Sequence, residues 1–290
     1  MPILSVALSS KVLMQEDTSH ILNNILRDLV DYALNGEVPG ASRSAAASCV
    51  FSVIASYQDK DNECIGLTLL QNQIFPIIVG NIEAEDKDSD IGISDALFDA
   101  MNFAAMIASA ASQRGKKSSI TADEVARFFV LVACEGAASA PVLGVRTPLD
   151  CNSDNSKQAA ATALGSILSV NGNPFAKQRL AHMIIPIVLT SSSIQSSGFL
   201  STDIGTLLCA CHIICCVPVK AIGQEKLSGL VSAIVQGFEG VLQQMICVDD
   251  NSSGKSAIVD QLISLLLTAL LKVYNQSLST VSEESYSLLL

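Results

Sequence analysis

Five sulfur and imidazole side chains that could bind a metal lie within eight residues, in Cys209-Ala-Cys211-His212-Ile-Ile-Cys215-Cys216. On a helix, Cys209, His212 and Cys216 share one face. Cys211 and Cys215 lie on an adjacent face, so three or four ligands could converge on zinc or iron. However, metal ligands usually come from loops and from more than one element, and no Cys-x-x-Cys pair is present. We expect a core helix without a metal, and a Cys/His metal site is the alternative.

No other group of residues predicts a reaction. His20, His182 and His212 lie outside any nucleophile motif, and the sequence contains no phosphate-binding or dinucleotide-binding glycine pattern. Carboxylates gather at residues 83–90 and 249–250, where we expect solvated loops. The sequence therefore predicts no catalytic residue, no cofactor and no small-molecule substrate, and it predicts that the protein is not an enzyme.

The composition is that of a helical protein with a large core. Of 290 residues, 49% are hydrophobic and 16% charged, which argues against disorder. Aromatic residues are 4% with no Trp, which disfavours β-sandwiches and barrels.

The net charge of −11 disfavours direct binding to nucleic acid or to an anionic membrane surface. Nine Cys without a framework spacing, and no basic region before the first apolar stretch, indicate a reducing compartment.

Helical periodicity recurs along the whole chain, and no segment is a clear strand. An N-terminal helical segment is expected at about residues 17–35. Helices then pair across polar connections in units of about 45 residues, which is typical of HEAT repeats. We expect about five pairs, at roughly 42–83, 94–135, 156–190, 202–246 and 256–290. The sequence predicts an all-α, HEAT-like helical-repeat solenoid over residues 1–290, and its apolar last residues indicate part of a longer array.

A Pro interrupts the apolar helical runs at Ile74–Val79 and at Ile184–Leu189. Because Pro lacks an N–H group and clashes with the preceding turn, each should kink its helix or start a new turn. The shared pattern is a weak sign of an internal repeat.

Several segments together resemble the C-terminal part of the MMS-nineteen (Met-eighteen) family. They are Ala159–Gly165, Asn173–Arg179 with the Pro-containing run that follows, Val217–Lys220 and Leu227–Val235. The family has a Gln-Arg pair opening a helix whose apolar face carries a Pro, then a helix ending in an apolar residue plus Pro, then a Leu-rich helix. Order and spacing are similar over about residues 159–240.

The resemblance implies a HEAT-repeat scaffold of the cytosolic iron-sulfur cluster assembly (CIA) targeting complex. Such an adaptor links assembly factors to client apoproteins, including DNA replication and repair enzymes. Its partners would be the other targeting-complex subunits and the clients, without direct nucleic-acid or membrane contact, and its location would be cytoplasmic and nuclear. Gln178 and Arg179 match the family's pair. We favour a structural role at the repeat junction, where an Arg commonly bonds free carbonyls, and the alternative is that they are partner-binding residues. The cysteine cluster lies outside the family pattern.

Two other functions stay open. One is a generic helical-repeat scaffold of the importin or vesicle-coat kind, and the other is a metal-binding protein that uses Cys209–Cys216. A scaffold predicts thiols packed in a core, whereas a metal protein predicts thiolates about 2.3 Å from a common point.

Overall fold

The computed structural model describes residues 16–56, 61–85, 95–112, 120–138, 149–151, 153–170, 174–195, 204–247 and 262–275. Helices make up nearly all of these residues, so the protein is all-α, as its sequence predicts. Within these ranges the strands are β1 (Ala137–Ala138) and β2 (Leu149–Asp150), which pair antiparallel. Two-residue strands have too little periodicity to be predicted from sequence.

The helices follow one another with short connections. In chain order they are α2 (Glu16–Leu34), α3 (Gly40–Ser56), α4 (Asp61–Leu69), the π-helical turn η2 (Leu70–Ile74), α5 (Phe75–Glu85), α6 (Asp95–Ser112), α7 (Ile120–Glu135), α8 (Asp154–Val170), α9 (Pro174–Gln195), α10 (Ile204–Cys216), α11 (Val219–Ile222) and α12 (Gln224–Cys247). A further helix covers Leu262–Asn275 and is called the 262–275 helix below. The second helix expected in the last pair, from residue 281 onward, lies outside the described residues.

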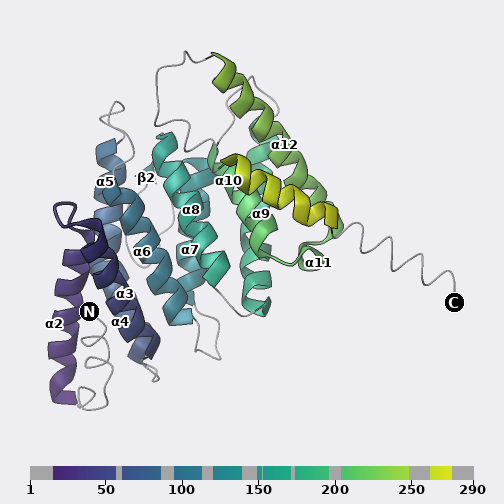
Figure 1. Ribbon diagram of the computed structural model, residues 1–290. Helices are drawn as coiled ribbons and strands as arrows, with labels where there is room; N and C mark the ends of the chain where they lie inside the picture. The colour runs from purple at the N-terminus through teal and green to yellow at the C-terminus, as the bar shows by residue number, and fades with distance from the viewer. Residues whose placement is uncertain are drawn as a thin grey trace, which may run out of the picture.

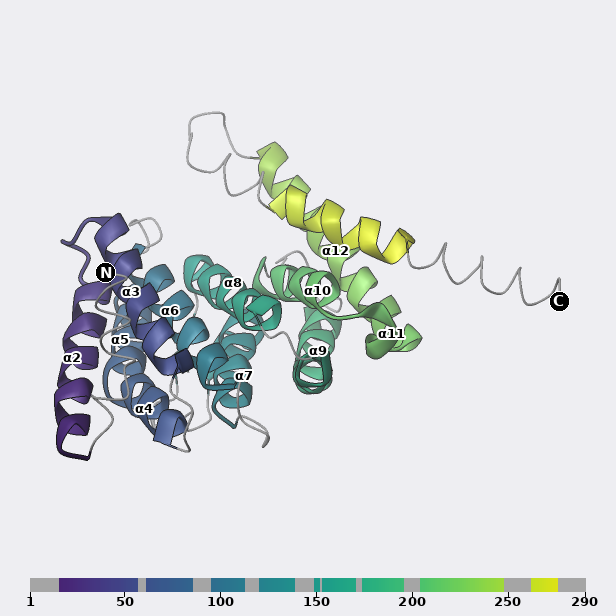
Figure 2. The ribbon, with the colours of Figure 1, turned by 60° about the horizontal axis from the view of Figure 1, so that its bottom comes forward.

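The helices stack side by side in two layers, in the order of the chain (Figure 1). In one layer α3, α6, α8 and α10 each contact the next, and in the other α7 contacts α9 and α9 contacts α12. Helix α8 also contacts α7, and α10 contacts α9, which ties the layers together. Helices α2 and α12 lie at opposite ends of the row (Figure 2). The buried apolar side chains form one continuous cluster along it, from Leu22 to Ala269.

The two prolines within helices are accommodated differently. Before Pro76 the helix widens into the π-helical turn η2, and the N–H of Phe75 donates to the carbonyl oxygen of Leu70, five residues earlier. Pro186 lies inside α9, which continues past it to Gln195. The new turn expected at Pro76 is thus a local π turn, whereas α9 continues as an α-helix past Pro186, so the two runs differ in their backbone hydrogen bonding.

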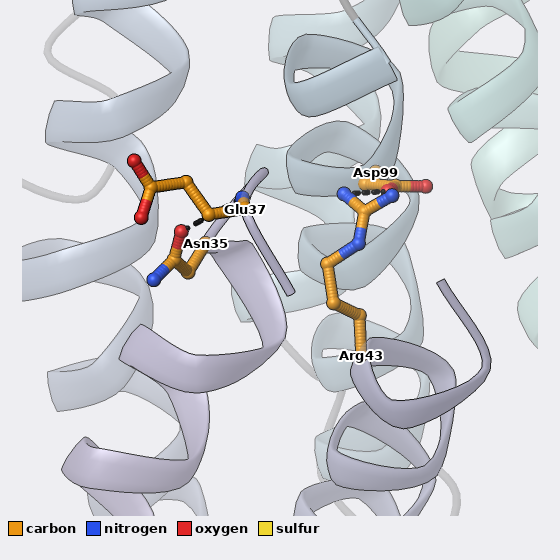
Figure 3. A network of polar contacts seen from close by, with 4 residues as sticks. All are labelled: Asn35, Glu37, Arg43 and Asp99. Atoms are coloured by element: carbon orange, nitrogen blue, oxygen red, sulfur yellow. Dashed lines mark hydrogen bonds and ion pairs between the residues drawn. The ribbon is translucent and has the colours of Figure 1, made fainter. Parts of the chain in front are cut away.

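Polar contacts join the first helices of the row (Figure 3). Asn35 follows α2, and its Oδ1 accepts a hydrogen bond from the backbone N–H of Glu37 at 2.9 Å, which closes the turn towards α3. Arg43 of α3 pairs with Asp99 of α6, with Nη1 and Oδ2 2.7 Å apart. The Asp99 side chain is 42% exposed, so this ion pair orients α3 against α6 and adds little stability.

One described helical stretch, Ile65–Glu83, is long and apolar enough to cross a membrane by length and composition. It comprises most of α4, η2 and α5. In the structure it packs against α2 and α6, and Leu70, Ile74 and Phe75 are buried in the common core.

Two glycines allow helices to approach more closely than any other residue would permit. A β-carbon at Gly205 of α10 would lie 2.0 Å from the carbonyl oxygen of Ala133 in α7. A β-carbon at Gly165 of α8 would lie 2.4 Å from Nδ1 of His212 in α10. The position of α10 in the stack therefore depends on the absence of side chains at these two points.

We predict that Gly205→Ala destabilises the protein by roughly 1–3 kcal/mol, because a backbone oxygen would have to move away from the added carbon. The matched control is Gly80→Ala in α5, where a β-carbon meets no atom within 4 Å. That change should be neutral or stabilising by up to about 1 kcal/mol, since Ala favours helix over Gly. Urea unfolding followed by circular dichroism measures both. If the two variants are equally stable, α10 does not approach α7 as closely at Gly205 as described.

Candidate functional site

Helix α10 carries the sulfur and imidazole side chains singled out in the sequence, and it lies inside the stack against α7, α8, α9 and α12. Cys209 and Cys211 are completely buried, whereas Cys215 and Cys216, in the last turn, are half-buried. All four are free thiols. This is the core helix that the apolar residues around the cysteines predict.

Three of these thiols are poorly suited to act as nucleophiles. Burial, with a smaller contribution from the neighbouring Cys215, raises the pKa of Cys211 to about 12. Burial also raises the pKa of Cys215 and of Cys216, although Lys272 opposes the change at both. The thiolate is the reactive and metal-binding form, so these groups are held in their unreactive protonated state at neutral pH.

The described residues contain no group of three or more His, Cys, Asp or Glu side chains that could hold a metal ion. Side chains on a single helix diverge from its axis, so a tetrahedral site needs ligands from a second element. The arrangement around α10 therefore gives no support to the alternative of a metal site at Cys209, Cys211, His212, Cys215 and Cys216.

His212 is a packing residue that is neutral at pH 7. Its ring lies against α8 at Gly165, as described above. Burial lowers its pKa from the ordinary 6.5 to about 4, because the charged imidazolium would lose its hydration.

Two lysines occupy the carboxyl ends of neighbouring helices. Lys272, from the 262–275 helix, donates hydrogen bonds to the carbonyl oxygens of Cys215 at 2.9 Å and Val217 at 3.0 Å, at the end of α10. Lys177, from the first turn of α9, lies 3.5 Å from the carbonyl oxygen of Ser169 at the end of α8. Each ammonium faces the negative end of a helix dipole and satisfies carbonyls that lack helical partners.

The contact of Lys272 also fixes the 262–275 helix to the stack. Burial lowers the pKa of Lys272, and the adjacent Cys215 and Cys216 partly offset this effect. One feature of the sequence marks Lys272 as a residue with a specific role: it is the only charged residue in the 14-residue helix at 262–275. Sequence reasoning could not identify which carbonyls it would reach.

Gln178 and Arg179 lie in the first part of α9, where Gln178 is half-buried and Arg179 is exposed. The guanidinium of Arg179 lies 3.0 Å from Oδ1 of Asp123, in the first turn of α7. Arg179 thus bridges two neighbouring helices of one layer through a carboxylate, not through the free carbonyls expected in its structural role. Its side chain is 43% exposed, so the pair leaves part of the guanidinium accessible.

Comparison with known proteins finds no relative: no protein-family model, no curated protein and no solved structure matches this chain.

We predict that His212 makes stability depend on pH between about 6.5 and 4. The unfolded chain binds a proton at His212 in this window and the folded chain does not, so stability falls as the pH drops and levels off below 4. The loss amounts to about 3 kcal/mol at pH 4. Urea unfolding from pH 7 to pH 4 measures it. The His212→Gln variant should lose less stability between pH 7 and pH 4, by the same amount. Parallel curves of stability against pH for the two proteins would show that His212 does not stay neutral in the folded chain.

We predict that Lys272→Met loosens the 262–275 helix while leaving the rest of the stack intact. Two hydrogen bonds from a partly exposed cation are lost, which costs about 1 kcal/mol. Hydrogen exchange followed by mass spectrometry should show faster exchange in residues 262–275 and unchanged exchange in α6–α8. Lys220→Met, at an exposed lysine of α11, is the matched control and should not change exchange in the 262–275 helix. Faster exchange in both variants would count against the specific contact.

Proposed function

We propose that this protein is a helical-repeat scaffold that acts by binding other proteins. The observation that carries the proposal is the two-layered row, in which each helix contacts its near neighbours and the core runs continuously along it. Such stacking is characteristic of HEAT-like solenoids, whose extended outer faces serve as binding surfaces. On α10, Cys209 and Cys211 are buried in the core, which also favours binding over reaction.

We further propose that the scaffold is an adaptor of the CIA targeting complex, which links assembly factors to client apoproteins. This finer proposal rests on the resemblance of residues 159–240 to the MMS-nineteen family. Three of the resembling residues lie where helices meet: Gly165 contacts His212 of α10, Pro218 precedes α11, and Arg179 pairs with Asp123. In a repeat array, contacts of this kind between helices restrict which residues can occupy these positions.

Reconstitution with purified CIA targeting-complex subunits tests the adaptor role. We predict that the chain co-elutes with them on analytical size exclusion and that an apoprotein client then joins the complex, without stoichiometric metal on the chain. Arg179→Ala should weaken assembly while costing less than about 1 kcal/mol in stability, because the ion pair of Arg179 with Asp123 is partly exposed. Circular dichroism melts verify that the variant is folded.

The other outcomes each reject the adaptor. If the folded chain binds no subunit and carries no metal, the CIA assignment fails and only the general scaffold function stands. Stoichiometric zinc or iron that disappears in Cys209→Ser and Cys216→Ser, without subunit binding, would instead establish the metal-binding alternative.

A further inference from the structure

The negative charges of this acidic protein are sparse around α9. Between residues 155 and 224 the sequence has a single acidic residue, Asp203, while the whole chain has a net charge of −11. Helix α9 contains Lys177, Arg179 and His182 and no carboxylate. This local reversal of sign gives α9 a surface unlike that of α2, which carries several acidic side chains.

The outer face of α9 combines cationic and apolar groups. Arg179 and His182 are exposed, and Met183 and Ile187 are half-buried beside them. These positions, with Pro186, are three or four residues apart and so form one stripe along the helix. We call this stripe, together with Lys226 of α12, the α9 basic face.

Lys226 brings a second cation to this face from α12. Its Nζ lies 3.4 Å from Nδ1 of His182. Within the described residues no carboxylate pairs with Lys226, and the carboxylates near the face are Asp123, which engages Arg179, and the exposed Glu225 on the same turn as Lys226. An ammonium that contacts an imidazole in place of a carboxylate keeps its attraction for an anion from outside.

The same face offers a backbone acceptor. Pro186 lies inside α9 and has no N–H, so the carbonyl oxygen of His182 lacks the hydrogen bond that the residue four positions later donates in a regular helix. A backbone N–H of a bound chain could donate to that oxygen, between the cationic end of the stripe and its apolar end.

We propose that the α9 basic face binds an acidic, partly apolar segment of a partner protein. Carboxylates of the segment pair with Lys226 and with the accessible part of Arg179, and an apolar side chain packs on Met183 and Ile187. A protein segment fits better than a nucleic acid, because a few cations interrupted by Asp123 and Glu225 cannot follow a regular row of phosphates. The proposal requires no CIA partner, so it can fail or succeed independently of the adaptor role.

Fluorescence anisotropy with the full chain tests this inference. The probe is a fluorescein-labelled peptide of four Asp-Asp-Leu repeats, and the comparison ligands are four Ser-Ser-Leu repeats and single-stranded oligo-dT of the same length. We expect the acidic peptide to bind, the serine peptide to bind at least about tenfold more weakly, and affinity to fall as salt rises.

Two charge reversals distinguish a defined site from general attraction. Lys226→Glu should weaken binding of the acidic peptide by about tenfold or more. Arg27→Glu changes the net charge equally, but at an exposed residue of α2 at the far end of the row, and should weaken binding less than about twofold. Met183→Gln should weaken it about threefold, through the loss of apolar contact. Thermal melts confirm that each variant is folded.

Three results would overturn the proposal. The wild-type chain could fail to bind the acidic peptide, or the two charge reversals could weaken binding equally, which would indicate attraction without a site. Binding of oligo-dT as tight as that of the peptide, with the same sensitivity to Lys226→Glu, would show that the face recognises phosphates and not a protein segment.

Discussion

The close approach of α10 to its neighbours is the constraint on which the central part of the row depends. Gly205 lets the start of α10 meet the end of α7, and Gly165 lets the ring of His212 lie against α8. With α10 seated this deeply, Cys209 and Cys211 are buried, the pKa of Cys211 is raised, and the pKa of His212 is lowered so that its imidazole is neutral. The packing of helices thus decides the chemistry of the side chains that first suggested a metal site.

The last carbonyl groups of each helix have no partner within the helix, and lysines satisfy some of them here. Lys177 serves the end of α8 and Lys272 the end of α10. Each comes from a later element, so the capping interaction also holds successive helices together. Lys177 and Lys272 are thus used at helix ends inside the stack, whereas Arg179 and Lys226 lie on the α9 basic face, where Arg179 pairs with Asp123.

The sequence predicted the helical class and the approximate range of most helices, because apolar periodicity and end signals are local properties. It missed α11, which has only four residues, and the π turn before Pro76, which depends on how the longer helix packs. At the candidate site, burial of Cys209 and Cys211 followed from their apolar neighbours. The pairing of Arg179 with Asp123 and the hydrogen bonds of Lys272 could not be foreseen, because they join residues 55 or more positions apart.

This division of roles indicates where the specificity of such a protein lies. The residues that resemble the MMS-nineteen pattern include glycines and prolines at helix junctions, and such residues define how helices pack without defining what the surface binds. A pattern made of packing positions can resemble a family in order and spacing while the outward residues between them differ. In the proposed scaffold function the partner would be selected by outward side chains such as those of the α9 basic face, whose cations come together where α9 and α12 contact each other.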